Sequence, residues 1–549
     1  MHFYDFDSDL QKVFNETYSN ISPVDWRSWL DVSSREDYES LSLKLSGLSS
    51  MEDFFERLKV EKTDPKLLSV NVESFLASYN GSKPLVICHT SGTSGGQLSD
   101  LKFYPIPEEL VRRLWAPGMQ AIFQASGLNR DSSAVIFVPS RIVGDGMSTV
   151  NGKTMIKLYS AEFSQRLMLS LIKPHQYLLY EYKDANNLQV LAEILSLDKI
   201  GIISAPASTV LGWADLEKLR QGLKKTQKTF SMSTESPESS ELLRLVDSLG
   251  IDVAAVEIRK RLSEVLSSAT IVFSISSITE GEWSKIREFM RWKKGSERFT
   301  NLYVGSEIGP FAATIARDDQ GLPVDDKMHV FPLTIPVIER KGERDLISRS
   351  THRIGKLLLS RFNISDYVIN IDTGDVIIIE SQEGLPRISG QVLRAGFRLK
   401  VKVVFKPETK IPREYHTFVG DYFELGELEI INPRHMLACL AERCKTNKEL
   451  PAVIKLGTSK EPSVMIITSP KGNECHTVKE IQKNLPLCPG GKTIEQAIKN
   501  KRLILETLNS NPVETETPKS ELLKLVRKGE LPKGILKQWP LYLATPLQI

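Results

Sequence analysis

This 549-residue sequence has few cysteines, and they follow no regular spacing. Its five cysteines are Cys88, Cys439, Cys444, Cys475 and Cys488. An odd and sparse set of this kind favours a reducing compartment over a disulfide framework. A metal site built from the last four cysteines and His476 is an alternative, but the sequence has no C-x2-C pair to support it. We therefore expect plain buried thiols.

The sequence also lacks a charge bias and a long apolar run. Lys and Arg number 71 against 68 Asp and Glu, so a net charge of +3 gives no overall reason to bind nucleic acid or a membrane surface. No basic stripe with interleaved aromatic residues is present either, which argues against DNA or RNA binding. Apolar runs such as Ala269–Ile275 are far shorter than the ~20 residues of a membrane-spanning helix. We expect no membrane span.

The N-terminal segment Met1–Asp7 is acidic and lacks the basic, apolar and small-residue order of a secretory signal. We therefore predict a cytoplasmic location. A length of 549 residues exceeds the ~250–300 residues of one hydrophobic core, so several domains are expected. The composition, 41% hydrophobic and 25% charged, excludes collagen-like, coiled-coil and wholly disordered proteins.

The patterning along the chain predicts an α/β protein with three parts. Residues 1–80 have near-helical spacing of apolar residues and are predicted to form a helical cap. Residues 81–420 are predicted to form a large α/β domain, because non-alternating apolar runs separated by helical stretches indicate parallel strands buried on both faces. Its later part, from about 329, is richer in β-branched strands and is predicted to be a largely antiparallel subdomain. Residues 421–549 are predicted to form a small α/β lid.

The strongest local signal is the segment His89–Gly96, which directly follows the apolar run Leu85–Cys88. Its four hydroxyl residues and three glycines form a turn whose N–H and O–H donors suit the phosphates of a nucleotide. We call residues 90–95 the hydroxyl loop. The Walker pattern G-x-x-x-x-G-K-[ST] is absent, so P-loop chemistry is not supported. A plain surface loop is the alternative for a Ser/Thr/Gly turn taken alone.

Two further motifs follow this loop in order. Tyr303-Val304-Gly305-Ser306-Glu307 continues into Ile308-Gly309-Pro310, and Asp372-Thr373-Gly374-Asp375 follows a strand pattern. Taken singly, a Ser-Glu pair is usually a solvated turn and Thr-Gly-Asp a hairpin corner. Taken together and in this order, the hydroxyl loop and these two motifs resemble the phosphate loop, the Y-G-x-[ST]-E element and the T-G-D element of adenylate-forming enzymes. The Gly-Pro continuation is similar to the phenylacetate-CoA ligase branch, and the likeness covers about residues 85–435.

The resemblance implies an ATP- and Mg²⁺-dependent ligase that converts a small-molecule carboxylate to an acyl-adenylate. It implies that the β- and γ-phosphates of ATP are held by Thr90, Ser91, Gly92, Thr93, Ser94 and Gly95. Glu307 would be a catalytic residue that helps to hold Mg²⁺, and Ser306 would contact the α-phosphate. Asp375 would accept two charge-assisted hydrogen bonds from the ribose hydroxyls.

The lid would complete the site through a hinge and a lysine. Gly420–Gly426, which runs on to Pro433, is similar to the hinge element of the family and keeps an aspartate, Asp421. The segment Arg387–Arg398 is the other hinge candidate, but Gly390 stands there in place of the aspartate, so we favour Asp421. In the tail, Thr515–Lys519 is similar to the P-K-T-x-x-G-K element, which makes Lys519 the candidate catalytic lysine. A solvated lysine before a helix is the alternative for Lys519.

Several family residues are missing. No Pro-Lys follows the hydroxyl loop, Asn370-Ile371 replaces Arg-Tyr before the T-G-D element, and Ser274–Ile278 replaces a glycine-rich turn on the adenine side. These departures leave three alternatives open. The enzyme passes the acyl group to a thiol of coenzyme A or of a carrier protein, it passes it to an amine as in plant hormone amido synthetases, or the chain is a weakened, nucleotide-binding regulatory protein. An acyl pocket is expected near residues 204–206 and Trp283.

Overall fold

The computed structural model describes most of the chain in separate ranges. These are residues 3–48, 50–64, 68–79, 83–89, 101–142, 144–230, 237–274, 278–362, 367–403, 415–425, 428–446, 450, 452–455, 457, 462–468, 475, 477–508 and 541–544. No helix within these ranges is long and apolar enough to cross a bilayer.

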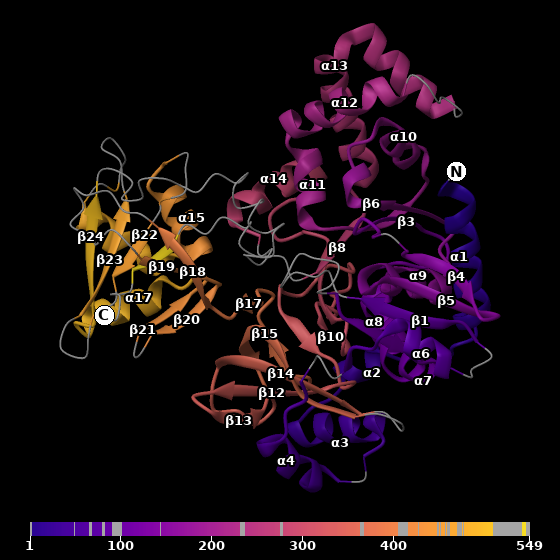
Figure 1. The fold of residues 1–549 in the computed structure, drawn as a ribbon. Helices are drawn as coiled ribbons and strands as arrows, with labels where there is room; N and C mark the ends of the chain where they lie inside the picture. Colours follow the sequence, from indigo (N-terminus) through magenta and orange to yellow (C-terminus); the bar gives the residue numbers. More distant parts are fainter. Residues whose placement is uncertain are drawn as a thin grey trace.

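The chain begins with short helices that pack against the main core (Figure 1). They are α1 (Phe3–Tyr18), α2 (Arg27–Leu30), α3 (Arg35–Ser46), α4 (Met51–Val60) and α6 (Val72–Ser78). Helix α3 begins where the Ser34 hydroxyl accepts the Asp37 N–H and ends at Gly47, which adopts the left-handed conformation (φ 75°). Leu10 and Phe14 of α1 are fully buried in the same core as the sheets. The predicted boundary near residue 80 stays a prediction.

A small sheet follows, with the strand order β2-β1-β5-β4. Its strands are β1 (Leu85–His89), β2 (Phe103–Ile106), β4 (Gly146–Val150) and β5 (Lys153–Tyr159). Strand β1 is parallel to β5 and antiparallel to β2. All five β1 residues are buried, as the apolar run predicted. However, β1 lies outside the parallel sheet that the other apolar runs form.

A long mixed sheet forms the centre of the molecule, in the order β13-β12-β14-β15-β16-β11-β10-β9-β8-β7-β3-β6. Its parallel half consists of β3 (Ser133–Val138), β6 (Gln176–Glu181), β7 (Ile200–Ser204), β8 (Thr270–Ser274) and β9 (Phe299–Gly305). Its antiparallel half consists of β10 (Gly309–Ala313), β11 (Met328–Val330), β12 (Ile335–Arg340), β13 (Glu343–Leu346), β14 (Ile354–Phe362), β15 (Tyr367–Ser381), β16 (Arg387–Ile388) and β17 (Leu393–Arg394). The predicted α/β class, with parallel strands and a β-rich part, is therefore confirmed.

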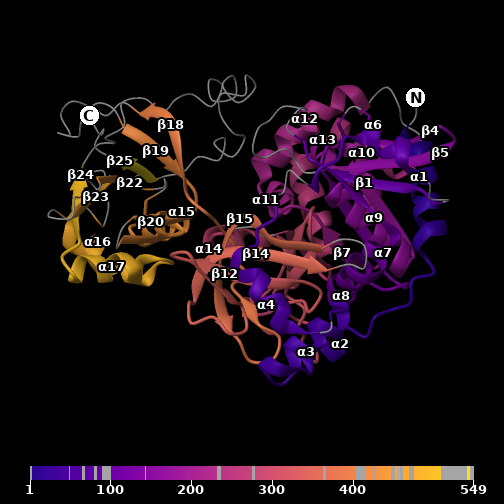
Figure 2. The same cartoon turned by 60° about the horizontal axis from the view of Figure 1, so that its bottom comes forward.

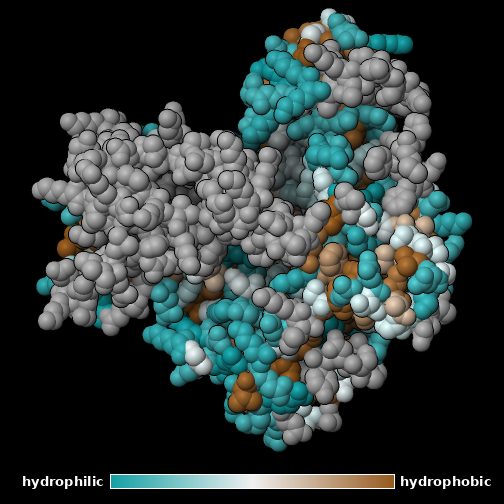
Figure 3. Space-filling model, in the orientation of Figure 1, coloured by the Kyte–Doolittle hydropathy of each residue, from teal (hydrophilic) through white to brown (hydrophobic). Residues whose placement is uncertain are grey.

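Helices cover the parallel half of the long sheet (Figures 1 and 2), and Figure 1 shows α12 and α13 projecting from it. They are α7 (Glu108–Leu110), the π-helical turn η2 (Val111–Trp115), α8 (Ala116–Ala125), α9 (Ser160–Ile172), η3 (Tyr182–Asp184), α10 (Leu188–Ser196), α11 (Ala207–Ala214), α12 (Leu216–Phe230), α13 (Pro237–Leu266) and α14 (Glu280–Met290). In the face shown in Figure 3, hydrophilic residues cover the region of β12 and β14.

The hairpins β18 (Phe397–Val403) with β19 (Tyr415–Val419), and β20 (Tyr422–Leu425) with β21 (Leu428–Ile431), lead to the last part of the chain. There, a sheet of order β24-β23-β22-β25 packs with helical segments. These elements are α15 (Pro433–Arg443), β22 (Ala452–Lys455), β23 (Ser463–Thr468), α16 (Val478–Asn484), η5 (Leu485–Leu487), α17 (Gly491–Lys499), β24 (Leu503–Leu508) and β25 (Leu541–Ala544). We call β20–β25 with α15–α17 the C-terminal unit. It has a hydrophobic core of its own, while the predicted boundary at 420/421 stays a prediction.

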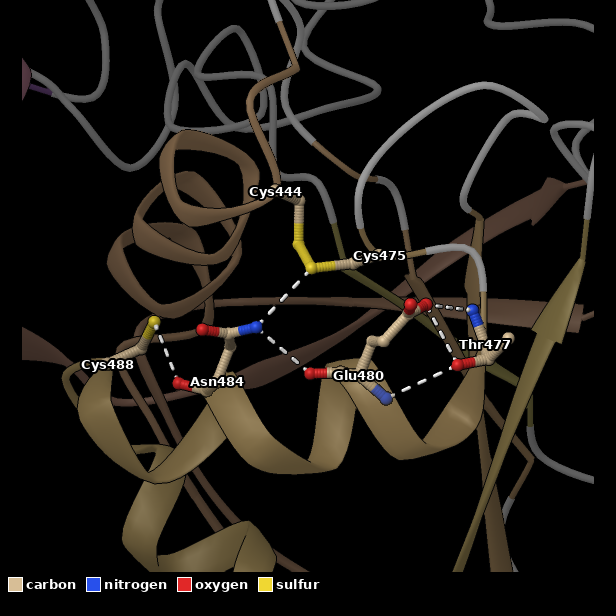
Figure 4. Close-up of a disulfide and its surroundings, with 6 residues drawn as sticks. All are labelled: Cys444, Cys475, Thr477, Glu480, Asn484 and Cys488. Carbon is tan, nitrogen blue, oxygen red and sulfur yellow. Dashed lines mark hydrogen bonds between the residues drawn. A yellow bond between two sulfur atoms is a disulfide. The ribbon is translucent and has the colours of Figure 1, made fainter.

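The C-terminal unit contains a disulfide that the sequence did not predict. Cys444, at the end of α15, is bonded to Cys475, and the Cα atoms are 5.1 Å apart. Figure 4 shows the amide of Asn484 against the sulfur of Cys475. The expectation of unpaired thiols is therefore wrong for these two residues, because sequence spacing does not reveal that the end of α15 meets the segment before α16. Cys88 and Cys488 are buried free thiols, as expected, whereas the free thiol Cys439 is only half-buried.

A buried ion cluster ties α1 to α9. Glu162 is fully buried and pairs with Arg166 at 2.9 Å and with Arg141 at 2.6 Å. Both arginines also pair with Asp7 of α1. Burial alone would raise the pKa of Glu162, but the hydrogen bonds and charges of the two arginines outweigh it and lower this pKa. The ion pairs therefore stabilise the fold above the unfolded-state pKa of Glu162, and this stabilisation is lost as the pH falls through the lower folded-state value.

We expect Arg166→Met to lower the free energy of unfolding by about 3 kcal/mol at neutral pH, because it removes one partner of a buried carboxylate. The loss should shrink in acid, where Glu162 becomes protonated. Urea denaturation followed by tryptophan fluorescence measures both values. Lys59→Met is the control: its pair with Glu56 is exposed, so a change within about 1 kcal/mol is expected. Equal losses in the two variants would contradict the assignment.

Candidate active site

The ends of three strands meet at one place. His89 ends β1 and lies opposite Tyr159, which ends the parallel strand β5. The two rings pack with their centroids 4.1 Å apart. The next residue, Ser160, begins α9, and its hydroxyl lies 2.7 Å from the hydroxyl of Ser306, directly after β9. The small sheet and the long sheet therefore present their carboxyl ends to each other.

Glu307 is held at this meeting point by a residue that the motifs did not predict. Glu307 is half-buried in the turn between β9 and β10. The hydroxyl of Tyr104, on β2, donates a hydrogen bond to Glu307 Oε1 at 3.0 Å. Burial, and then the charge of Glu307, raise the pKa of Tyr104. The phenol therefore remains protonated and continues to act as the donor.

A buried pair lies at the end of β1. His89 Nε2 is 2.9 Å from Asp145 Oδ2, and both side chains are fully buried. The same carboxylate oxygen accepts the N–H of Ile142 at 3.1 Å. These contacts fix the imidazole ring one residue before the hydroxyl loop begins. No sequence pattern pointed to Asp145, because it lies in a segment far from His89 along the chain.

Asp375 is in β15, in the antiparallel half of the long sheet. Its side chain is buried, and Tyr303 of β9 donates a hydrogen bond from its hydroxyl to Asp375 Oδ2 at 2.6 Å. Arg394 of β17 pairs with Asp375 Oδ1 at 3.2 Å. Gly374 adopts a positive φ of 72° at an irregularity within β15, so the T-G-D element is part of a strand and not a hairpin corner. The T-G-D and Y-G-x-[ST]-E elements are thus in direct contact through Tyr303.

The two hinge candidates lie side by side. The N–H of Asp421 donates to the carbonyl of Arg394 at 2.8 Å, and the N–H of Arg394 donates to Asp421 Oδ2 at 3.1 Å. Gly420, with φ 150°, crosses Gly396 so closely that a β-carbon on Gly420 would lie 2.5 Å from the Gly396 Cα. Both segments are therefore part of one junction, and neither excludes the other.

The structure does not describe every predicted site residue. The hydroxyl loop residues Thr90, Ser91, Gly92, Thr93, Ser94 and Gly95 lie outside the described residues. Lys519 also lies outside them. Their roles stay predictions. Of the described candidates, Ser306 and Glu307 lie together, Asp375 is linked to them through β9, and Asp421 contacts the residue that pairs with Asp375.

A cavity of about 440 Å³ extends along the face of β9 that carries Asn301. Phe273, Trp283 and Phe299 form an aromatic wall. Asn301 is only 4% exposed and donates from Nδ2 to the carbonyl of Gly390 at 2.5 Å. Its Oδ1 has no hydrogen-bond partner among the described residues, which leaves a buried acceptor in the cavity. Trp283 lines this cavity and residues 204–206 do not, so the acyl pocket expected near these residues stays a prediction.

The chain was compared with known proteins. No protein-family model matches it, and no curated protein does. Among solved structures, 2-hydroxyisobutyryl-CoA ligase in the postadenylation state with 2-HIB-AMP has a TM-score of 0.42 and 11% identity, over 96% of this chain and 93% of that chain. The acyl acid amido synthetase GH3.15 has a TM-score of 0.39 and 13% identity, over 96% of each chain.

A third solved structure is the amide bond synthetase McbA from Marinactinospora thermotolerans, with a TM-score of 0.34 and 11% identity, over 72% of this chain and 62% of that chain. At this level of identity the likeness is one of fold.

We expect the His89–Asp145 pair to be a coupled structural unit at the start of the site. Asp145→Asn removes a buried charge-assisted hydrogen bond and should lower the free energy of unfolding by about 1–3 kcal/mol. In the double variant with His89→Gln the losses should not add, because both changes break the same contact. Urea denaturation of the four proteins measures this coupling, with the exposed Asp319→Asn as control. Additive losses would contradict a direct interaction.

Proposed function

We propose that this chain is a ligase that activates a carboxylate with ATP to form an acyl-adenylate, and then transfers the acyl group to a thiol. The observation that supports this most is the meeting of His89, Ser160, Ser306 and Glu307 at the ends of β1, β5 and β9. It brings His89, the residue before the hydroxyl loop, to the same strand ends as the Ser-Glu pair, although the two are more than two hundred residues apart in the sequence.

The first half-reaction needs charge neutralisation and positioning. A carboxylate oxygen attacks the α-phosphorus of ATP, the bond from this phosphorus to the bridging oxygen breaks, and pyrophosphate leaves. Hydroxyls of the hydroxyl loop, with Ser160 and Ser306, would donate hydrogen bonds to phosphate oxygens and hold the chain of phosphates in line. Donors fixed in advance lose little free energy to reorganisation during the reaction.

The donor set also fits Mg²⁺. Glu307 offers a carboxylate, and Ser160 and Ser306 offer hydroxyls, and these oxygens are the hard ligands that Mg²⁺ prefers. Within the part of the chain that the structure describes, no group of three or more His, Cys, Asp or Glu side chains is arranged to hold a metal ion. One carboxylate is enough for a Mg²⁺ ion whose other ligands are the phosphates of ATP and water. When bound, Mg²⁺ would offset negative charge on the phosphate oxygens.

The nucleoside of ATP would lie along β9. Asp375 would bind the ribose hydroxyls. Its carboxylate would then accept hydrogen bonds from the ribose as well as from Arg394 or Tyr303. The cavity next to it would receive the adenine ring between aromatic side chains, with the exocyclic amine donating to Asn301 Oδ1. This supplies an adenine site without the glycine-rich turn that the sequence lacks.

The acceptor is the finer part of the proposal. We propose a thiol of coenzyme A or of a carrier protein's pantetheine. An amine acceptor would use the same adenylate, and a regulatory protein would bind the nucleotide without making it. Exchange of labelled pyrophosphate into ATP, screened over a library of carboxylic acids, tests adenylation. Thiols and amines offered to the best acid then identify the acceptor.

Glu307→Gln should lower the exchange rate at least about tenfold and raise the Mg²⁺ concentration needed for half the maximal rate, because an amide is a weaker ligand for a hard cation. The assay is the exchange reaction titrated with Mg²⁺. Glu343→Gln, on an exposed side chain away from the site, is the control and should behave as wild type. A wild-type Mg²⁺ titration in Glu307→Gln would rule out the assignment. Nucleotide binding with no exchange for any acid would favour the regulatory alternative.

We also propose that residues 421–549 are a mobile lid that delivers Lys519 to the α-phosphate. Its ammonium group would offset charge in the adenylation transition state but not in acyl transfer, when AMP leaves. Lys519→Ala should therefore depress acyl-adenylate formation strongly and leave transfer from supplied acyl-adenylate nearly intact. The two half-reactions are assayed separately, with the exposed Lys492→Ala as control. Equal loss in both, or no loss, would shift the assignment to Lys524 or Lys533.

A further inference from the structure

We propose that Tyr104 is a positioning residue that makes Glu307 a one-oxygen ligand and thereby favours Mg²⁺ over Ca²⁺. This inference rests on the proposed function, because it concerns the cation that accompanies ATP. It goes beyond that proposal because it assigns the preference for one cation to Tyr104, which lies in the small sheet and not in the long sheet that carries Glu307. Tyr104 lies outside the motifs that the sequence revealed.

The position of Tyr104 is set by strand pairing. Tyr104 lies opposite Cys88 in the antiparallel pair of β1 and β2, and it is 4% exposed. Glu307 follows β9, in the long sheet. The single hydrogen bond from the Tyr104 hydroxyl to Glu307 Oε1 therefore spans the two sheets. The ring is fixed within the core, so the direction of its O–H group is largely fixed as well.

The chemistry of the carboxylate follows from this contact. A phenol that donates to Oε1 draws on the charge and lone pairs of that oxygen. Oε2 is the oxygen that this hydrogen bond does not engage, so it is the better ligand for a cation.

One-oxygen ligation distinguishes the two common divalent cations. Mg²⁺ takes six ligands in a tight octahedron and usually binds a carboxylate through one oxygen, with water and phosphate as the other ligands. Ca²⁺ takes six to eight ligands and often binds both oxygens of a carboxylate. A carboxylate with Oε1 engaged by a phenol cannot offer two equal oxygens. The Tyr104 contact therefore penalises Ca²⁺ more than Mg²⁺.

Tyr104→Phe tests this idea, because it removes the hydroxyl and keeps the ring. The probe is α,β-methylene-ATP, which cannot release pyrophosphate, and its affinity is measured by isothermal titration calorimetry with Mg²⁺ or with Ca²⁺. The dissociation constant with Ca²⁺ divided by that with Mg²⁺ should fall by about threefold to tenfold in the variant, which is the scale of one hydrogen bond. Tyr182→Phe, at an exposed tyrosine, is the control and should leave the ratio unchanged.

Glu307→Asp provides a second variant if Tyr104→Phe is poorly folded. The shorter side chain draws the carboxylate away from the phenol, so it should shift the ratio in the same direction with Tyr104 intact. An unchanged ratio in a folded Tyr104→Phe protein would overturn the inference while leaving the proposed function standing. Absence of nucleotide binding by the wild-type protein with either cation would overturn both.

Discussion

Parallel pairing of β1 with β5 is the constraint on which the candidate site depends. Because parallel neighbours end at the same edge, His89 and Tyr159 are brought into ring contact, and Ser160 is directed to Ser306. The end of β9 then supplies Glu307, and its Tyr303 reaches Asp375. Side chains from four separate stretches of sequence thus meet because a few strand ends meet.

Local patterns predicted the strands well and their partners poorly. The apolar runs that contain Ala134–Val138, Ile200–Ile203 and Thr270–Phe273 form β3, β7 and β8 of one parallel sheet, as expected from their lack of alternation. The run Leu85–Cys88 has the same pattern, but it forms β1 in the small sheet, between the antiparallel neighbour β2 and the parallel neighbour β5. Burial on both faces produces the pattern in each case, and burial does not specify which strand lies alongside.

The same limit explains which site residues the sequence revealed. Ser306, Glu307 and Asp375 were predicted because each belongs to a contiguous motif. Tyr104 and Asn301 were not, since one donates a hydrogen bond between two sheets and the other has an unpartnered oxygen in a cavity. The disulfide between Cys444 and Cys475 was missed for a related reason: its geometry depends on how α15 meets a distant segment. Each of these features is a property of tertiary contacts.

The crossing of Gly396 and Gly420 has a mechanical consequence. At this junction, two backbone segments lie against each other, held by hydrogen bonds between Arg394 and Asp421 and from the Gly396 N–H to the carbonyl of Tyr422. A single-chain linker would bend in any direction. A paired ribbon is stiff against bending in its own plane and yields most readily by twisting about its length. Any turning of the C-terminal unit would therefore follow one preferred axis, which passes through the close crossing of the two glycines.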